Sequence, residues 1–353
     1  MTKALPEPWE ALLRQVSRSF YLTLRILPGT IRPQIGLAYL LARTTDTIAD
    51  TRIVPLDRRR AALREMRSAI RAVADGRNAE EPDLGELTDA CSVSAGRRLA
   101  AERSLLENAG EMISLLGSLT SEDRCRICDL LEIITRGQDA DLALFGMACE
   151  DRIVALESDD DLEEYTYRVA GCVGEFWTRV CRTHLFPRAD LDETFLLCSG
   201  IRFGKGLQLV NILRDLPEDL RQGRCYLPSR RLAQAGLEPS SLLDPGAMGS
   251  FRPLYAGYIR QAEELLAAGW TYTNALPRSQ VRVRLACAWP ILIGMRTLAH
   301  LRSVNVLDTS QRVKVSRGEV RLLMIRSVLC YPRQTAWDRL FLQAGADRAI
   351  RPL

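Results

Sequence analysis

The amino-acid sequence predicts an all-α protein, and three observations support this fold class. Apolar residues recur with helical spacing along almost the whole chain, so most segments can bury one face of a helix. Aromatic residues make up only 6% of the chain, and the apolar–polar alternation of strands is scarce. Proline and glycine gather between the periodic segments, where helices are expected to end.

The periodic segments, taken in order, predict helices that end at breaks containing proline or glycine. No break is long enough to be a domain linker, and 47% apolar residues can fill a large core. We therefore expect a single domain over residues 1–353, with a core at about 14–325 and a C-terminal tail at 326–353. The predicted helices are 7–16, 19–27, 31–51, 57–75, 86–117, 121–148, 160–185, 190–216, 229–236, 250–275, 279–303, 317–328 and 334–344.

The composition argues against several kinds of active site. Because the chain has only His184 and His300, histidine-based metal sites and Ser-His-Asp catalysis are nearly excluded. The ten cysteines show no disulfide framework, and the Cys125/Cys128 pair lacks a second pair that would complete a metal site. These cysteines fit a reducing compartment. The net charge of +4 gives no reason to expect a nucleic-acid partner.

The N-terminus and the apolar stretches bear on cellular location. The first ten residues contain two prolines and no apolar core, so we expect no signal peptide. The longest strongly apolar stretch, Leu285–Met295, is too short to span a bilayer. We expect a cytoplasmic protein whose membrane contact, on the inner membrane, is at most peripheral.

Two pairs of aspartates share one internal spacing and lie 169 residues apart. Asp46 and Asp50 form the first pair, and Asp215 and Asp219 form the second. Residues four apart in a helix lie on one face, so each pair could hold hard cations through carboxylate oxygens. Such pairs are commonly solvated helix faces, but both occur in largely apolar segments, where an unpaired carboxylate is costly to bury. If the two helices face each other, a metal-bridged diphosphate is the obvious ligand.

The helix predicted at 31–51 carries a polar stripe through apolar surroundings. Tyr39 and Arg43 recur at helical spacing before Asp46 and Asp50. An arginine beside two aspartates can be a plain salt bridge, but its guanidinium could also bind phosphate oxygens that a metal leaves free. A polar stripe in an apolar helix favours a lined cavity over a solvent-exposed face.

The helix predicted at 190–216 repeats this design. Gly204 and Gly206 lower helix stability, so close approach by a neighbour or a ligand would explain them. Pro217 is expected to end or kink the helix near the second aspartate. The polar residues of this stripe are Gln208, Asn211, Asp215 and Asp219, with Arg214 adjacent and with Arg221 and Arg224 in the following segment.

Two further segments carry candidate ligand-binding residues. Tyr165 precedes a strip of small residues (Ala170, Gly171 and Gly174) that permits tight helix packing or leaves room for a long apolar chain. Near the N-terminus, hydroxyl and guanidinium donors suited to a diphosphate come from Ser17, Arg18 and Ser19, which Phe20 follows. Ser17 could equally be a helix N-cap.

Together these segments resemble the squalene/phytoene synthase family of head-to-head prenyl transferases. The resemblance spans about residues 14–325, and the order and spacing of its signatures agree: 17–20, 39–50, 136–141, 165–174 and 208–219. It implies the isoprenoid (terpenoid) synthase fold, with the aspartate motifs on opposite walls of a central cavity. Residues 287–298 and 313–318 look more like squalene synthases than phytoene synthases, although Ala286 and Ser316 depart from that pattern.

The resemblance implies a squalene synthase in which the four aspartates hold Mg²⁺ (or Mn²⁺) and so bind two farnesyl diphosphate molecules. Condensation would give presqualene diphosphate, with Tyr165 or the released diphosphate accepting a proton, and NADPH would then reduce it to squalene. Substrate contacts are implied for Ser17, Arg18, Ser19, Phe20, Tyr39, Arg43, Gln208, Asn211, Arg214 and Arg224, and cofactor contacts for Asn211, Arg214 and Lys314.

Three alternatives remain open at the level of sequence. A phytoene or dehydrosqualene synthase would carry out the same condensation without NADPH. A presqualene diphosphate synthase would stop halfway. A non-catalytic assembly factor of the same fold belongs to a different class, and it is disfavoured because such proteins lose the acidic motifs that are intact in this chain.

Overall fold

The structure is a computed structural model that describes residues 6–17, 20–92 and 97–346. It confirms the all-α fold class, because within these residues the two strands, β1 and β2, have only two residues each. The chain groups into two compact units. Unit 1 comprises Met1–Gly146 and Phe176–Arg188, and unit 2 comprises Met147–Glu175 and Ala189–Leu353. The expectation of a single domain stays a prediction.

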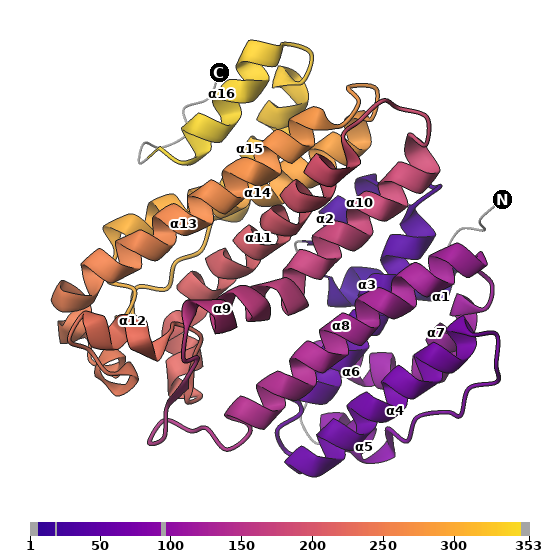
Figure 1. Cartoon of the computed structure of the whole chain (residues 1–353), viewed down its shortest axis with the longest axis horizontal. Helices are drawn as coiled ribbons and strands as arrows, with labels where there is room; N and C mark the ends of the chain where they lie inside the picture. Colours follow the sequence, from indigo (N-terminus) through magenta and orange to yellow (C-terminus); the bar gives the residue numbers. More distant parts are fainter. Residues whose placement is uncertain (1–5, 18–19, 93–96, 347–353) are drawn as a thin grey trace. The chain divides into compact units, whose positions relative to one another are not determined.

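Helix α3 is the central helix of unit 1, because it contacts α4, α6, α7 and α8 (Figure 1). Its residues 33–48 are buried except at Tyr39, Ala42, Arg43 and Asp46, and three of these belong to the polar stripe that the sequence indicates. The helices of this unit are α1 (Glu7–Val16), α2 (Phe20–Ile26), α3 (Arg32–Asp50), α4 (Leu56–Ala74), α5 (Gly85–Ser92), α6 (Arg97–Glu107), α7 (Ala109–Leu116) and α8 (Ser121–Phe145).

A buried carboxylate joins α3 to α8 within unit 1. Asp123 on α8 is 1% exposed and accepts hydrogen bonds from Gln34 of α3 at 3.1 Å and from Arg126 at 2.8 Å. His184 Nε2 lies 2.9 Å from the same carboxylate. Burial alone would raise the pKa of Asp123, but the hydrogen bonds from His184 and Gln34 hold it below its ordinary value. The ionised carboxylate therefore fixes α3 beside α8.

Helix α11 is the central helix of unit 2, because it contacts α9, α13 and α14. Helix α10 begins in unit 2 and continues into unit 1. The elements are β1 (Val154–Ala155), α9 (Asp159–Thr166), a π-helical turn (Tyr167–Gly171), α10 (Cys172–Leu185), α11 (Glu193–Arg221), β2 (Arg224–Cys225), α12 (Ser229–Gln234), 3₁₀ turns at Pro239–Leu243 and Pro245–Ala247, α13 (Met248–Ala275), α14 (Val281–Ser303), α15 (Arg317–Cys330) and α16 (Gln334–Ala344).

The predicted helix at 86–117 is wrong as a single element. Helices α5, α6 and α7 occupy this range, and α6 ends at Glu107 just before α7 begins at Ala109. The Asn108 side chain donates a hydrogen bond to the Ser104 carbonyl at 2.7 Å. Such local side-chain bonds compete with the helical ladder, which accounts for the break there.

The predicted end of the helix at residue 216 is also wrong, because α11 continues through Pro217 to Arg221. Proline lacks the N–H that would donate to the carbonyl four residues earlier, which is that of Leu213. Tyr255 on α13 fills this position, since its buried hydroxyl donates to the Leu213 carbonyl at 3.0 Å. Because the Tyr255 hydroxyl replaces the missing N–H donor, α11 continues far enough to include both Asp215 and Asp219.

The structure agrees with the expectation that Leu285–Met295 does not span a bilayer. This stretch lies inside α14, and no helix among the described residues is long and apolar enough to cross a membrane.

Candidate active site

The first pair of aspartates lies in the last two turns of α3. Asp46 Oδ1 accepts a hydrogen bond from Gln138 Nε2 at 2.6 Å, and Arg43 Nη1 lies 3.5 Å from Asp46 Oδ2. Arg43 also donates to Glu102 at 3.2 Å, which fixes its guanidinium beside the aspartate. Asp50, one turn further along, is exposed. The structure thus brings Arg43 and the two aspartates together, as the spacing predicts.

The surroundings of Asp46 disfavour its negative charge. Burial and the neighbouring Asp50 carboxylate raise the pKa of Asp46 to about 6, although Arg43 and the Gln138 hydrogen bond lower it. The side chain is nevertheless 46% exposed, so the carboxylate lies in a recess that solvent can reach. A bound cation would stabilise the ionised form of this carboxylate, and solvent access lets a cation reach it.

Ser17 and Tyr39 both bond to carbonyls of α1. Ser17 is 3% exposed and donates to the Leu13 carbonyl, so it closes the C-terminus of α1 and is not an N-cap. The Tyr39 hydroxyl donates to the Val16 carbonyl at 3.4 Å. Arg18, Ser19 and the side chain of Phe20 lie outside the described residues.

The second pair of aspartates lies near the C-terminus of α11. Arg214 donates two hydrogen bonds to Asp215, from Nε to Oδ1 at 2.8 Å and from Nη2 to Oδ2 at 2.5 Å. These two side chains are 37% and 36% exposed. A cation that binds Asp215 would therefore replace Arg214 at the carboxylate and leave the guanidinium available to an anion. Asp219 follows one turn later and is half-buried.

Tyr165 joins several of the predicted residues of unit 2. Its ring stacks on Tyr226 with centroids 4.5 Å apart, and its hydroxyl accepts from Gln208 Nε2 at 3.5 Å. Arg224 Nη1 lies 3.5 Å from the Tyr226 hydroxyl, and Asn211 donates to Gln208 at 3.4 Å. Tyr226, which is buried, was not predicted, although it lies two residues after Arg224 in the same short segment.

The short parallel pairing of β1 with β2, which the sequence did not predict, fixes the backbone position of Arg224. Val154 N donates to the Gly223 carbonyl at 2.8 Å and Leu156 N to the Cys225 carbonyl at 3.0 Å, so β1 holds β2. Gly223 has φ of +79°, and a Cβ there would lie 2.3 Å from Cys149 N. Glycine is therefore required at the turn that leads from α11 to Arg224.

The strip of small residues serves helix packing, which was one of the two alternatives. A Cβ on Gly174 would lie 1.9 Å from the Gly200 carbonyl oxygen, and a Cβ on Gly204 would lie 2.1 Å from the Ala170 carbonyl oxygen. The backbones of these segments are therefore in direct contact. At Gly206 a Cβ would lie 2.9 Å from Leu265 Cβ, so a neighbouring helix explains this glycine too.

A pocket of about 370 Å³ lies beside Asp215 in unit 2. One wall is the end of α11, and the other is the segment that precedes α15 and reaches Val313. Lys314, the next residue, is exposed. The lining combines positive and negative side chains: Arg214, Arg221, Arg312, Asp215, Glu218 and Asp308.

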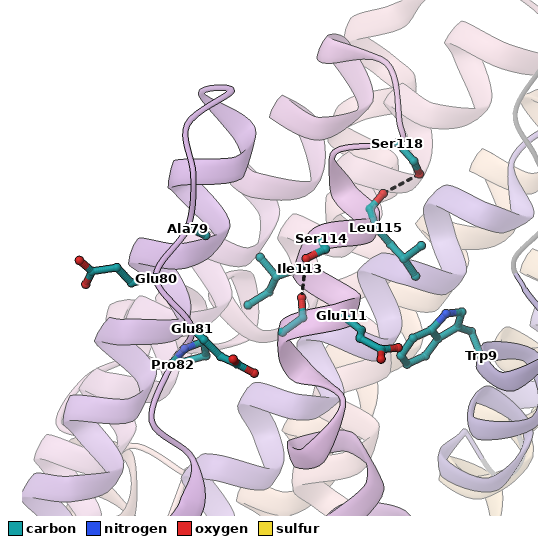
Figure 2. A pocket seen from close by; sticks show the side chains of 11 residues that line it. Trp9, Ala79, Glu80, Glu81, Pro82, Glu111, Ile113, Ser114, Leu115 and Ser118 are labelled. Atoms are coloured by element: carbon teal, nitrogen blue, oxygen red, sulfur yellow. Dashed lines mark hydrogen bonds between the residues drawn. The ribbon is translucent and has the colours of Figure 1, made fainter.

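A hollow of about 580 Å³ in unit 1 contains none of the predicted site residues. Figure 2 shows that Glu111 extends towards Trp9 and that Glu80 and Glu81 lie near the other side. Its serine hydroxyls donate to carbonyls of their own segment, Ser114 to Gly110 at 3.0 Å and Ser118 to Leu115 at 2.7 Å. The lining has three glutamates but, unlike the aspartate pairs, no arginine beside them.

The donor set limits how a metal could be held. Among the residues that the structure describes, no three His, Cys, Asp or Glu side chains are grouped so that they could hold an ion. Each motif thus supplies two carboxylates. This fits Mg²⁺, which is commonly bound by one or two carboxylates together with substrate phosphates and water.

Comparison with known proteins identifies the family. The profile described as "Squalene/phytoene synthase" matches residues 13–319. The chain belongs to the squalene/phytoene synthase family. Both acidic pairs, Tyr165 and Arg224 lie within the matched range, and Lys314 lies near its end.

Relatives within this family carry different names. The chain is 24% identical over 323 residues to a squalene synthase of Schizosaccharomyces pombe, which covers 90% of this chain and 64% of the relative. It is 28% identical to a bifunctional lycopene cyclase/phytoene synthase of Sporisorium reilianum, over 62% of this chain and 36% of the relative. It is 29% identical to a presqualene diphosphate synthase of Rhodopseudomonas palustris, over 79% of this chain and 82% of the relative. The matched region thus spans less than two thirds of the length of each of the two fungal relatives.

The fold is that of solved squalene synthases. A structure of TcSQS in complex with a ligand superimposes with a TM-score of 0.71 over 96% of each chain, at 20% sequence identity. The expected isoprenoid synthase fold is therefore confirmed.

Proposed function

We propose that this chain catalyses the Mg²⁺-dependent head-to-head condensation of two farnesyl diphosphate molecules to presqualene diphosphate, and then its NADPH-dependent reduction to squalene. One observation carries the proposal. The central helix of each unit presents an acidic pair beside an arginine, in a chain that belongs to this family.

The two aspartate motifs would hold the metal ions. Mg²⁺, for which Mn²⁺ could substitute, would neutralise the charge that develops on a departing diphosphate. Asp46 and Asp50 would ligate on α3, and Asp215 and Asp219 on α11. Arg43 and Arg214 now pair with Asp46 and Asp215, and cation binding at these carboxylates would turn both guanidinium groups towards diphosphate oxygens.

Tyr165 would steer proton loss during the condensation. Its hydroxyl accepts from Gln208, and its ring is held by stacking on Tyr226. This positions the phenol oxygen. The released diphosphate would accept the proton that is lost as the cyclopropane closes, either directly or through Tyr165, whose hydroxyl would pass its own proton to the diphosphate as it takes up that of the substrate. Arg224, beside Tyr226, and Gln208 and Asn211 would contact substrate.

The pocket beside Asp215 supports the reductive step. It lies between the segment that ends at Val313 and the end of α11 that would bind the metal, next to Arg214. Lys314, Asn211 and Arg214 would bind the phosphates of NADPH, for which arginine and lysine are suited donors.

A presqualene diphosphate synthase is the second candidate. The relative of that name in Rhodopseudomonas palustris matches over 82% of its own length, which is more than for the two fungal relatives. Such an enzyme would use the same four aspartates and would not need Lys314.

Product analysis separates these candidates. The purified chain is incubated with Mg²⁺ and either farnesyl diphosphate or geranylgeranyl diphosphate, with and without NADPH, and the products are identified by mass spectrometry. Squalene that appears only with NADPH supports the proposal, and presqualene diphosphate in both reactions supports the second candidate. Dehydrosqualene with and without NADPH would overturn the reductive step. Phytoene from geranylgeranyl diphosphate, with no product from farnesyl diphosphate, would overturn the proposed substrate.

A further inference from the structure

Helix α15 in unit 2 buries two polar side chains beside Leu323 and Cys330, and it exposes three large apolar side chains. Arg326 and Ser327 are buried, at 7% and 0% exposure. Ile325, Val328 and Leu329 are 57%, 51% and 62% exposed. A helix at the surface of a soluble protein normally shows the reverse arrangement.

Hydrogen bonds hold both inward polar side chains in place, although the buried Arg326 Nε has no partner among the described residues. Arg326 Nη2 donates to Gln343 of α16 at 2.5 Å, and the Ser327 hydroxyl accepts from Trp289 Nε1 at 2.9 Å. Turning the helix to bury its apolar face would break both bonds and leave a buried indole N–H without its partner. The outward apolar face is therefore fixed by the fold.

Positive charge surrounds this apolar face. Arg321, Ile325, Val328 and Leu329 recur at helical spacing on one side of α15, with Arg317 one turn before them and Arg333 just beyond the helix. All three arginines are exposed. Leu342 on α16, next to the Gln343 that binds Arg326, adds a further apolar side chain at 71% exposure.

The segment that carries this face has a positive net charge. Residues 314–342 contain six basic and two acidic residues, and the basic residues include the buried Arg326. Of the two acidic residues, Glu319 is paired with Arg296 at 3.1 Å.

We infer that the outer face of α15, with the adjoining end of α16, is a docking surface for an anionic lipid bilayer. The apolar side chains would enter the interface between headgroups and acyl chains, while the flanking arginines would reach lipid phosphates. The inference stands on this surface alone and does not depend on the proposed activity.

A second copy of this chain fits the surface less well. A two-fold contact brings the same patch of both copies together, so the arginines at the two ends would face arginines of the partner. Like charges opposed in this way weaken association. The face also comprises few residues, compared with the roughly 20–30 that each partner contributes to a stable interface.

The test measures co-sedimentation of the full chain with vesicles of phosphatidylcholine containing about one third phosphatidylglycerol, and with vesicles of phosphatidylcholine alone. Two triple variants are compared, Ile325→Gln/Val328→Gln/Leu329→Gln and Arg317→Gln/Arg321→Gln/Arg333→Gln. A control variant replaces three exposed apolar residues elsewhere, Ile53, Leu144 and Met147, with glutamine. Circular dichroism checks that every variant is folded.

We expect the wild type and the control to bind the anionic vesicles, with binding weakened by salt. The apolar variant should lose at least tenfold in partitioning, and the arginine variant about fivefold for each charge removed. Absence of wild-type binding would overturn the inference, as would binding that the apolar variant retains in full. A dimer in solution that the apolar variant dissociates, without vesicle binding, would also overturn it and assign the face to self-association.

Discussion

At Asp46, burial and the nearby Asp50 carboxylate raise the pKa to about 6, so the folded protein binds a proton at this site more readily than the unfolded chain does. The sign of the effect on stability follows from proton linkage. Between the ordinary value of 3.8 and about 6 the folded state carries more protons, so its stability falls as the pH rises through this window. At neutral pH the ionised carboxylate therefore destabilises the protein when no metal is bound.

Asp46→Asn removes this charge without changing the volume of the side chain. In buffer containing EDTA at pH 7.5, we expect its Tm to exceed that of the wild type, and we expect the difference to shrink as the pH falls towards 4. Thermal unfolding followed by circular dichroism measures both quantities. Asp129→Asn, at an exposed site on α8, is the matched control. A lower Tm for Asp46→Asn than for the wild type at pH 7.5 would contradict the assigned cost of the charge.

The sequence predicts which residues share a helix face but not which residues meet across helices. The spacing of Tyr39, Arg43 and Asp46 was sufficient to place them on one stripe of α3. The hydrogen bond from Gln138 to Asp46 joins residues 92 positions apart, and no periodicity indicates such a contact. Ser17 shows the same limit, because its bond to Leu13 depends on where α1 ends.

At the scale of elements, the continuity of α11 depends on a hydrogen bond that the Tyr255 hydroxyl of α13 donates to the Leu213 carbonyl. Replacing Tyr255 with phenylalanine leaves the buried Leu213 carbonyl without a partner, which should destabilise the protein by about 1–3 kcal/mol. Denaturant unfolding at pH 7.5 measures this cost. In a Pro217→Ala background the residue at 217 regains its N–H and can serve Leu213, so the same replacement should cost less. If Tyr255→Phe lowers the free energy of unfolding equally in both backgrounds, this explanation of the continuous helix is wrong.

Contact between backbones on α11 makes Gly204 intolerant of a side chain. Gly204→Ala would place Cβ 2.1 Å from the Ala170 carbonyl oxygen, and the shift needed should cost roughly 2–3 kcal/mol. Gly257→Ala on α13 is the matched control, because a Cβ there meets no atom closer than 3.8 Å, and it should gain up to about 1 kcal/mol from helix propensity. Urea unfolding compares the two. A neutral Gly204→Ala variant would show that the helices can separate freely, against the packing described here.

Element types were easier to predict than element ends. Helical periodicity is strong in this chain, so α3, α4, α13 and α14 fall within one or two residues of their predicted ranges. The errors arose where tertiary contacts or side-chain bonds decide the outcome. Pro217 is tolerated because Tyr255 lies nearby, and the α6–α7 break follows from a bond of Asn108. The β1–β2 pairing joins two-residue segments that are too short for any pattern.

At the scale of the whole molecule, each compact unit contributes one acidic pair on its central helix. Two carboxylates from one helix make an incomplete metal site, so the proposed reaction needs substrate phosphates to complete both. The account therefore requires that each pair is indispensable to one and the same reaction.

The most direct test measures presqualene diphosphate formation and diphosphate release from farnesyl diphosphate and Mg²⁺, for Asp46→Asn and Asp215→Asn. Asp129→Asn and Asp159→Asn, at exposed salt-bridged sites, serve as controls. We predict that both motif variants stay folded and lose activity on the order of a hundredfold or more, while the controls match the wild type. Near-normal turnover by either motif variant, or no product from the wild type, would contradict the account.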